Sequence, residues 1–510
     1  MSQLEVAKND EENNDHYINN IPPEVFRYIL SHLPHYNDLL VCKLVCKYWY
    51  DCVISTLETR ARKFKTCLRS SNIEWYHYYP LDTPHISARY SHSCCLHSNL
   101  MYIFGGCNSG KTTFNDMWTF DLSQRQWIRP ISSGNYPPPK ACCSLVSYKD
   151  KLILFGGWTH SSSNRIHDSW KLFNHIHEFD TKTSRWSLIE VMSDCPPMAG
   201  HKACIYGIEM IVFGGLQSLE NAPYNYLASN DVFAFNISGH TWRKVNTDGP
   251  KPPPRYGHSQ LVIDDHLIVL GGSSGPKKFL SDFWILDMRT EPWTWHPIEV
   301  NYSQSSEPPI IGTNPVCKVD DLLVCLGRNV NSKSSPSLND VNFFKKILDR
   351  HRCKPCGSTN RPRYRLQPQP SQLERRKLMS SGRYVTTDNE TNTINKPIIN
   401  SRSIESTKSP QSKGVKPIKL TTQKSHFSPN SHDALFLYTL DISRIVTEKK
   451  VTWLPQENHV PGPQQLLLYS LVVGDSEIIM FGGVRLENGL SNNSSVSNSI
   501  YIVTAQKTII

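Results

Sequence analysis

The sequence predicts a multidomain protein in which a small all-α module precedes an all-β propeller of six blades, with a long disordered insertion. Two observations support this expectation. An apolar run ending in two glycines recurs along most of the chain, and a short segment with large apolar residues at helical spacing precedes the first copy. Self-similarity at a fixed period is the sequence signature of propellers and other repeat architectures.

The repeat is defined by its diglycine. Good copies end at five positions: Gly106, Gly157, Gly215, Gly272 and Gly483. A degenerate copy, LLVCLGR, ends at Arg328, and the steps from the first copy to this one are 51, 58, 57 and 56 residues. A period of roughly 50 residues is typical of a blade of four strands. Glycine permits positive φ and close backbone approach, where strands crowd the central channel.

Each unit also closes on a tryptophan, a side chain large enough to fill the wedge between neighbouring sheets. These residues are Trp127, Trp186, Trp242, Trp295 and Trp453. The repeats then lie near 88–127, 138–186, 197–242, 253–295, 308–453 and 461–504, within a propeller of residues 67–328 and 432–510. The last unit lacks its tryptophan strand. We expect the spare strand at 73–79 to complete it and close the ring, since closure removes exposed sheet edges.

The fifth unit is about a hundred residues too long. The excess, 329–431, is rich in Ser, Asn, Pro, Lys and Arg, which predicts a disordered basic insertion. Residues 329–430 hold 20 Lys and Arg against 6 Asp and Glu, a surplus of 14, so the rest of the chain carries −4 of the net +10. Its basic runs could bind acidic partners or nucleic acid, or act as a nuclear localisation signal. It could also gate or supplement substrate recognition, with phosphorylation of its Ser-Pro pairs tuning its charge. A solvated linker is the simpler interpretation, and we expect no DNA partner.

The helical module is predicted at 20–66, after a polar stretch, 1–19, that we expect to be disordered. Two prolines open a helix where their missing N–H is harmless. Val25, Ile29 and Leu33 follow at four-residue spacing, and Asp38 is a candidate N-cap for a second helix. So few residues cannot bury so many large apolar side chains among themselves, so part of this surface should meet a partner.

Both modules resemble known families. The helical segment contains IPPEV from Ile21, ILSHLP from Ile29, DLL from Asp38 and VCKYW from Val45, which is similar to the F-box pattern with isoleucine in place of the usual opening leucine. The diglycine units with their tryptophans resemble Kelch repeats. An F-box followed by six Kelch blades is the order of an F-box and Kelch-repeat protein.

The resemblance implies a non-enzymatic substrate-recognition subunit of an SCF ubiquitin ligase. F-boxes dock on the Skp1 adaptor and, through it, on cullin and RING subunits. The residues that would make or support this contact are Pro22, Glu24, Ile29, Leu30, Leu33, Pro34, Leu39 and Trp49. A Kelch scaffold independent of ubiquitin is an alternative. Some Kelch propellers are copper oxidases, but the histidines here recur singly rather than in a ligand cluster, which disfavours that class.

The Kelch geometry implies that the unknown protein substrate meets loops leaving the diglycine strands and loops between blades. Our candidates there are Arg89, Lys140, Trp158, Arg165, His201 and Arg255. The arginine fork suits carboxylate or phosphate, whereas a histidine recurring once per blade is more often a packing element. We expect no metal or cofactor: Cys353 and Cys356 have the spacing of half a zinc site without a second half.

The expected location is cytoplasmic, nuclear or both. The N-terminus lacks the basic start and apolar core of a secretory signal, and no apolar run approaches the roughly 18 residues of a membrane span. The fifteen cysteines are odd in number and scattered, as expected for free thiols in a reducing compartment.

Overall fold

The computed structural model describes the following residues: 21–33, 36–78, 84–110, 112–160, 171–193, 195–219, 222–275, 278–302, 311–328, 422–424, 434–455, 460–485 and 495–506. The chain divides into two compact units. The unit made of Met1–Cys353 and Thr421–Ile510 contains every described residue, whereas Lys354–Leu420 lies outside them.

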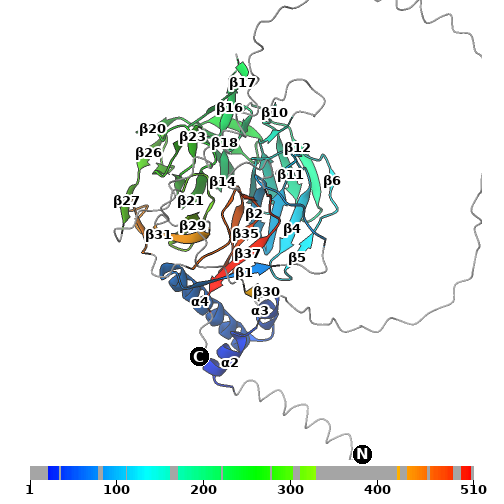
Figure 1. Ribbon diagram of the computed structural model, residues 1–510, viewed down its shortest axis with the longest axis vertical. Helices are drawn as coiled ribbons and strands as arrows, with labels where there is room; N and C mark the ends of the chain where they lie inside the picture. The colour runs from blue at the N-terminus through cyan, green and yellow to red at the C-terminus, as the bar shows by residue number, and fades with distance from the viewer. Residues whose placement is uncertain are drawn as a thin grey trace, which may run out of the picture. The chain divides into compact units, whose positions relative to one another are not determined.

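The helical module consists of α2 (Pro23–Leu30), α3 (Asn37–Cys42) and α4 (Lys47–Arg69) (Figure 1). The expectation that Asp38 caps the second helix is wrong, because α3 begins at Asn37 and Asp38 lies in its first turn. A carboxylate there still faces the positive end of the helix dipole. The N-terminal half of α4 packs on α2 through Cys52 and Val53, and α4 continues toward the strands.

The fold class predicted from the sequence is confirmed: six sheets of four or five strands form the blades. Blades one to three, from the inner strand outward, are β2 (Ser93–His97), β3 (Leu100–Phe104), β4 (Met117–Asp121) and β5 (Gln126–Ile128); β7 (Ser144–Tyr148), β8 (Lys151–Phe155), β11 (Ile176–Asp180), β12 (Arg185–Ile189) and β6 (Ser133–Gly134); and β14 (Lys202–Tyr206), β15 (Glu209–Phe213), β18 (Val232–Asn236) and β19 (Thr241–Lys244).

Blades four to six continue the pattern with β21 (Ser259–Ile263), β22 (His266–Leu270), β25 (Phe283–Asp287), β26 (Trp293–Pro297) and β20 (Thr247–Asp248); β28 (Val316–Val319), β29 (Leu322–Arg328), β31 (Leu435–Asp441), β32 (Lys450–Trp453) and β27 (Glu299–Tyr302); and β34 (Ser470–Gly474), β35 (Glu477–Phe481), β37 (Ile500–Ala505), β1 (Ile73–Tyr78) and β30 (Thr422–Lys424).

Four smaller sheets lie in the loops that follow the diglycines. They are β9 (Trp158–Thr159) with β10 (Lys171–Leu172); β13 (Met198–Ala199) with β16 (Leu216–Leu219) and β17 (Ala222–Ala228); β23 (Ser273–Gly275) with β24 (Lys278–Phe279); and β33 (Leu466–Leu467) with β36 (Val484–Arg485).

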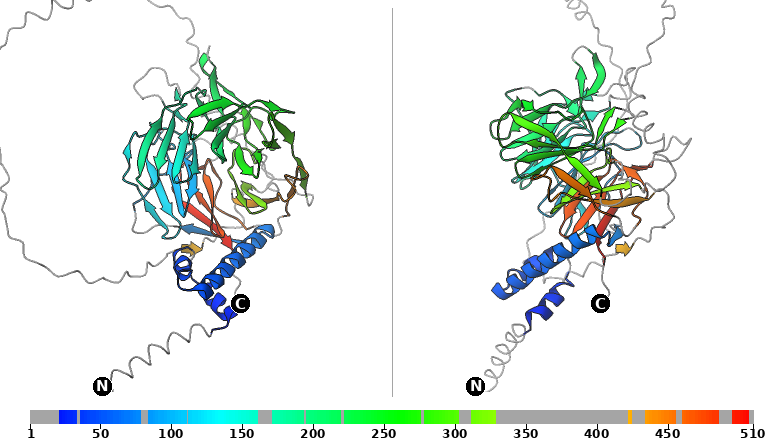
Figure 2. Two further views of the ribbon diagram at one scale, coloured as in Figure 1. Left: turned by 180° about the vertical axis from the view of Figure 1, so that it is seen from behind. Right: turned by 90° about the vertical axis from the view of Figure 1, so that its left-hand side faces the viewer.

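Blade six joins distant parts of the sequence. Strand β1 pairs antiparallel with β37, with Trp75 opposite Val503. At the outer edge β30 pairs with β1, with Tyr76 opposite Lys424. The expectation of disorder throughout 329–431 is therefore wrong for the three residues of β30, and the rest of that segment from residue 329 lies outside the described residues. Figure 2 shows α4 beside β1 and β37 from two further directions.

The diglycines are where one blade meets the next. Gly156 has φ +67°, and a Cβ there would lie 2.5 Å from Cε1 of His201 in the following blade. The second glycine of each pair donates its N–H to a backbone carbonyl of that blade, over 2.6–3.1 Å. These pairs are Gly106 with Lys140, Gly157 with Met198, Gly215 with Arg255, Gly272 with Gly312, and Gly483 with Arg89. Any larger side chain would push neighbouring blades apart.

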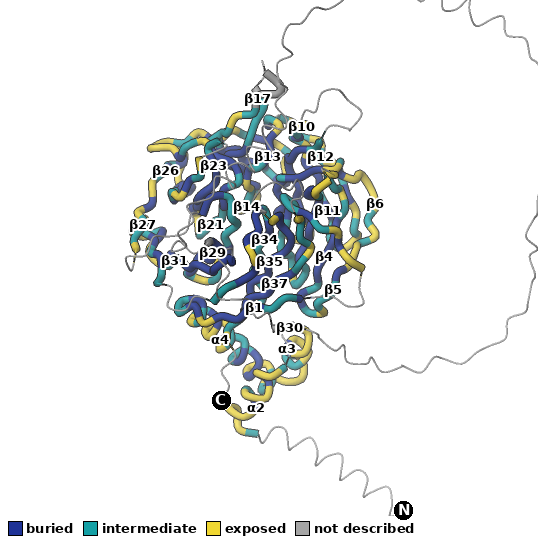
Figure 3. Tube along the Cα trace, viewed as in Figure 1, coloured by how far each residue is buried: buried dark blue, intermediate teal, exposed yellow. Residues whose placement is uncertain are grey.

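The tryptophans fill the wedge between neighbouring blades. Four of the five pack against the phenylalanine that precedes the diglycine of the blade before: Trp127 on Phe481 with ring centroids 5.0 Å apart, Trp186 on Phe104 at 5.5 Å, Trp242 on Phe155 at 4.8 Å and Trp295 on Phe213 at 5.2 Å. The fifth, Trp453, lies in one buried cluster with Leu270, which precedes the diglycine of blade four. The core is thus a ring of inter-blade layers. Burial is highest in the second strands, such as β22 and β35, in which every residue is buried, and Figure 3 shows the exposed residues of α2 and α3.

Candidate functional site

The strand order gives the ring two faces. On one lie the turns between the first and second strands of each blade and between the third and fourth. On the other lie the loops after each diglycine and the connections between blades. The helical module contacts the first of these faces. Lys65 pairs with Asp320 and Asp321 in the turn between β28 and β29, and Arg69 bridges Asp321 and Asp441, both at 2.8 Å.

A buried contact adds a second attachment point. Tyr36, before α3, donates to Glu477 at the start of β35, and Arg125 in the turn between β4 and β5 pairs with the same carboxylate. Phe64 and Leu68 of α4 are buried in the core of blades five and six. The helical module is therefore fixed to the ring by apolar packing, a buried hydrogen bond and partly exposed ion pairs.

The free surface of the helical module is apolar. Its exposed large hydrophobic side chains are Val25, Tyr28, Ile29, Leu40, Val41, Leu44, Val45 and Tyr50. Leu44 is 84% exposed, an unusual fraction for leucine in a folded domain. Contiguous exposed apolar surface of this kind marks a protein-binding face.

The predicted adaptor residues divide into two groups. Pro22, Glu24 and Ile29 are exposed, with Ile29 at 46%, and Leu33 and Trp49 are half-buried. Leu30 and Leu39 are each 1% exposed and form the core of the module with Phe26, Cys52 and Val53, so they can support a partner contact but not make it. Pro34 lies outside the described residues.

The predicted list omits the most exposed apolar residues of the module, Val41, Leu44 and Val45. The signal that could have found them is in the sequence. They form an almost continuous apolar run after the two-leucine motif, and a helix as short as α3 can bury only one side of such a run.

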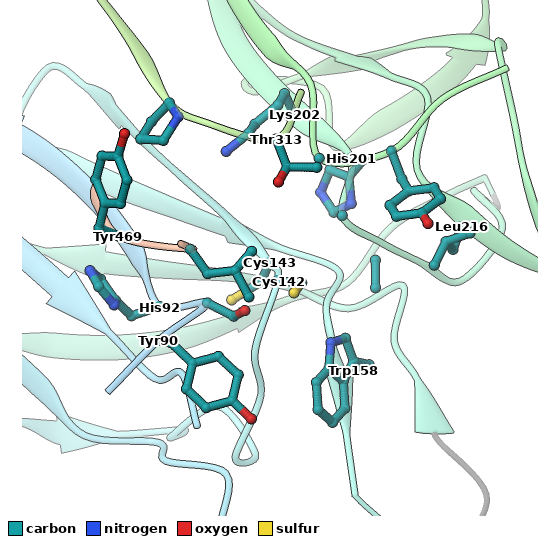
Figure 4. Close-up of a pocket in the computed structure, with 17 residues that line it drawn as sticks. Tyr90, His92, Cys142, Cys143, Trp158, His201, Lys202, Leu216, Thr313 and Tyr469 are labelled. Atoms are coloured by element: carbon teal, nitrogen blue, oxygen red, sulfur yellow. The ribbon is translucent and has the colours of Figure 1, made fainter. Parts of the chain in front are cut away.

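The opposite face of the ring contains a cavity of about 150 Å³ at the centre of the blades. All six blades contribute to its lining, mainly through the residues before each inner strand (Figure 4). Trp158 and Tyr90 lie on one side in this view, with Lys202 and Thr313 across from them. Of the residues predicted to bind substrate, His201 and Trp158 line this cavity.

Arg89 and Arg255 lie elsewhere than predicted. Both side chains are fully buried, and each guanidinium binds an aspartate of its own blade: Asp116 at 2.8 and 3.0 Å, and Asp282 at 2.8 and 2.7 Å. Burial alone would raise the pKa of each aspartate, but the guanidinium beside it holds that pKa below its ordinary value. Because both forks are occupied, these arginines hold strands together and present no donor to a ligand.

Lys140 occupies the equivalent position in blade two and is also fully buried. Its blade has His175 where blades one and four have the aspartate, as the hydrogen bonds from Gly105, Gly156 and Gly271 to this position show. The Lys140 ammonium has no hydrogen-bond partner among the described residues and lies 4.8 Å from the ring centroid of Phe173. Burial lowers the pKa of Lys140 to about 8. Arg165 lies outside the described residues.

The recurring histidines connect blades. Nε2 of His92 lies 2.9 Å from Ser470 Oγ, and Nε2 of His201 lies 3.0 Å from Ser144 Oγ, in each case in the preceding blade. Burial lowers the pKa of both imidazoles to about 3, so they are neutral near pH 7. His201 thus lines the cavity and also has a packing role.

Comparisons with known proteins also separate the helical module from the ring. Residues 18–60 match the F-box-like family model, residues 89–293 match the FBX42 beta-propeller domain, and residues 222–365 match the Attractin/LZTR1 beta-propeller. Kelch domain-containing protein 1 of Mus musculus is 32% identical over 229 residues, which cover 40% of this chain and 54% of that protein. Kelch domain-containing protein 3 of Homo sapiens is 29% identical over 215 residues, covering 39% and 53%.

The chain spans about half the length of these curated relatives. The solved structure titled "Structure of YjhT" aligns with a TM-score of 0.45 and 13% identity, over 82% of this chain and 95% of that one. Among the described helices, none is long and apolar enough to cross a membrane. With an F-box-like match on the helices and Kelch-type matches on the ring, the chain is an F-box and Kelch-repeat protein.

Proposed function

We propose that the chain is the substrate-recognition subunit of an SCF ubiquitin ligase in the cytoplasm, the nucleus or both. The F-box-like module binds the Skp1 adaptor, and through it the cullin and RING subunits, while the propeller binds the protein to be ubiquitinated and degraded. The observation that carries this proposal is the exposed apolar face of α2, α3 and the start of α4, on a module fixed to the ring face opposite the central cavity.

This role requires no catalytic residue in the chain, and F-box and Kelch propeller families are generally non-catalytic adaptors. Two partners held on one rigid body meet at a high effective concentration. The contacts of Lys65, Arg69 and Tyr36 limit rotation between the modules. Holding substrate and ubiquitin-charged enzyme at a fixed separation favours transfer to lysines within reach.

The adaptor contact is tested with a paired substitution, Val41→Glu with Leu44→Glu. Both side chains are exposed, at 64% and 84%, so the chain should fold normally while the apolar face gains two charges. We expect capture of purified Skp1 to fall at least tenfold, which is about 1.4 kcal/mol or more. The matched control is Ile131→Glu with Met192→Glu on the propeller, where the side chains are 96% and 84% exposed, and adaptor capture should not change. Equal capture by both variants would contradict the proposal.

The degradation step is tested by affinity capture from cells with the wild-type chain and with the Val41→Glu, Leu44→Glu variant. Proteins enriched on the variant, whose cellular abundance rises when it replaces the wild type, are the expected substrates. A ubiquitin-independent scaffold predicts the same captured proteins from both forms with unchanged abundance.

A further inference from the structure

Two inner strands depart from the repeat: β28 in blade five begins with the apolar Val316, and β14 in blade three begins with a charged residue. The strand-initial residue is serine in four blades, and each serine side chain contacts the following blade. Ser93 donates to the Cys143 carbonyl at 2.5 Å, Ser144 binds His201 at 3.0 Å, Ser259 donates to the Asn314 carbonyl at 3.3 Å, and Ser470 binds His92 at 2.9 Å. In blade three the residue at this position is Lys202, the first residue of β14.

The substitution removes an inter-blade contact. His92 and His201 each bind the serine of the preceding blade, whereas the blade before His258 supplies Lys202 at that place. His258 is fully buried, and neither of its ring nitrogens has a hydrogen-bond partner in another blade; the polar side chain that approaches it is Gln260, two residues later on its own strand. Leaving a buried polar group unpaired costs on the order of 1–3 kcal/mol. Positions that break a structural rule at such a cost are the expected places of function.

Lys202 lines the central cavity and is the one ionised side chain among the residues that do so. Among the described residues no carboxylate lines the cavity, and the Lys202 side chain has no ion pair or hydrogen bond with any of them. Protein atoms surround it closely enough that burial lowers its pKa, although the side chain keeps accessible surface inside the cavity.

The titratable groups facing Lys202 do not neutralise it. Burial lowers the pKa of His92, His201 and His258 far enough that all three are uncharged near pH 7. Burial also raises the pKa of the Cys94 and Cys142 thiols, which therefore stay protonated. The cavity thus holds a single uncompensated positive charge.

A second unpaired polar group lies in the same lining. The hydroxyl of Tyr469 in blade six belongs to a side chain that is 5% exposed, and it has no hydrogen-bond partner among the described residues. In Figure 4 this hydroxyl, the Lys202 amine and Thr313 occupy one side of the view, with Trp158 and Tyr90 on the other. The cavity therefore has a cation opposite an aromatic wall, with an unpaired hydroxyl just beneath its surface.

The geometry points to a binding site for a single unmodified aspartate or glutamate side chain of a substrate protein, with Lys202 as its ionic partner and an adjacent apolar substrate residue against Trp158. This inference rests on the proposed function, because it treats the cavity as the place where the propeller receives its substrate. A substrate protein would then need an accessible acidic side chain next to an apolar one.

Two other anions fit the cavity less well. A phosphorylated residue carries about −1.5 to −2 charges and is bound by clusters of arginine, whereas Arg89 and Arg255 are buried and bound to aspartates. A chain terminus is typically held in a nest of backbone N–H groups, and the glycines near the cavity donate theirs to neighbouring blades: Gly200 to Cys142, Gly257 to Gly200 and Gly215 to Arg255. The single positive charge of Lys202 is balanced by the single negative charge of one carboxylate.

The test uses the full chain bound to Skp1 and a phage-displayed library of random 12-residue peptides. Selected peptides are synthesised with amidated C-termini and measured by fluorescence anisotropy. We expect them to share an acidic residue next to an apolar one, and replacement of that acid by its amide should weaken binding at least tenfold. Peptides without a shared acid, peptides that bind only with a free C-terminus or only when phosphorylated, or no selected peptide at all would overturn the proposal.

The decisive variant is Lys202→Ser, which introduces the serine that four of the other blades have at this position. It should bind the selected peptides at least tenfold more weakly while unfolding at the same or a higher temperature, because His258 regains a partner. A purely structural Lys202 predicts unchanged peptide binding, and that result rejects the site. Lys182→Ser removes one positive charge from the opposite face, where the side chain is 72% exposed, and should leave binding unchanged. Peptide binding needs no ubiquitin transfer, so its failure would leave the ligase role to be judged by Skp1 capture alone.

Discussion

The hydroxyl of Tyr36 donates a 2.7 Å hydrogen bond to the carboxylate of Glu477, which joins the F-box-like module to blade six. The two residues are 5% and 2% exposed, and Arg125 binds the other carboxylate oxygen at 2.6 Å. The N–H of Asp475 also donates to the Tyr36 hydroxyl. Burial and then the neighbouring carboxylate raise the pKa of Tyr36, so the phenol stays protonated as the donor.

Tyr36→Phe should loosen the module without unfolding the propeller. The change removes one hydrogen bond to a buried carboxylate, which is worth about 1.5–3 kcal/mol. Hydrogen exchange should speed up in α3 and α4, while the inner strands of the blades keep their protection. Tyr28→Phe is the matched control, since this side chain is 57% exposed on the same module. Equal exchange in the two variants would show that the Glu477 contact does not restrain the module.

Arg255→Met should destabilise the propeller by about 2–3 kcal/mol in urea unfolding. It leaves Asp282 without its partner, and breaking a buried ion pair from one side is costly. Arg289→Met breaks an ion pair of similar length, 2.6 Å, in which the arginine is 60% exposed, and should cost under about 1 kcal/mol. If Arg255→Met costs no more than this control, Arg255 is not a structural residue.

Lys140→Met should stabilise the chain by about 2 kcal/mol near pH 7. The folded-state pKa of about 8 lies below the ordinary 10.5, so the unfolded chain binds this proton more tightly. The free-energy cost of burying the charged lysine is full below about pH 8 and disappears as the pH rises toward 10.5. The free energy of unfolding of the wild type, relative to that of the variant, therefore increases across this pH range. Paired urea titrations at pH 7 and pH 9.5 measure this. Lys149→Met, at an exposed position in the turn between β7 and β8, should give the same difference at both values.

Gly156→Ala should destabilise far more than Gly207→Ala. Both glycines have positive φ, +67° and +58°, so both variants incur about 1–2 kcal/mol of backbone strain. A Cβ at Gly156 also meets His201 at 2.5 Å and the Met198 carbonyl at 2.7 Å, whereas nothing lies within 4 Å at Gly207. We expect a thermal unfolding temperature several degrees lower for Gly156→Ala than for the control. Similar temperatures would mean that the inter-blade contact is easily relaxed.

The propeller could be predicted because the residues that hold its blades together recur from repeat to repeat. Each diglycine makes the same inter-blade hydrogen bond, and four of the five tryptophans pack on a phenylalanine of the preceding blade, so a degenerate unit can be recognised from the others. The F-box motif could be recognised because it is contiguous. Strand β30 could not be predicted, since three residues in a long polar segment carry no periodic signal.

The substrate-binding residues were harder to predict, because the position of a residue within the repeat does not determine where its side chain points. Arg89 and Arg255 were taken for surface groups, yet each has an aspartate 27 residues later, and that shared spacing was the available signal. Lys202 could have been found by aligning the units on their histidines, where His-Ser at 92 and 258 becomes His-Lys at 201. A departure from a repeat is more informative about binding than the repeat itself.

The pairing of β1 with β37 also means that blade six can be completed only late in translation. Strand β1 leaves the ribosome more than 400 residues before its partner, which at about 5–20 residues per second is an interval of tens of seconds. Until then the edge of β1 is unpaired, and the last blade, on which Glu477 and the Tyr36 contact depend, is incomplete. A chain truncated before residue 500 would add a bare strand edge to the apolar face that is already exposed. The protein would then itself resemble a substrate for quality control.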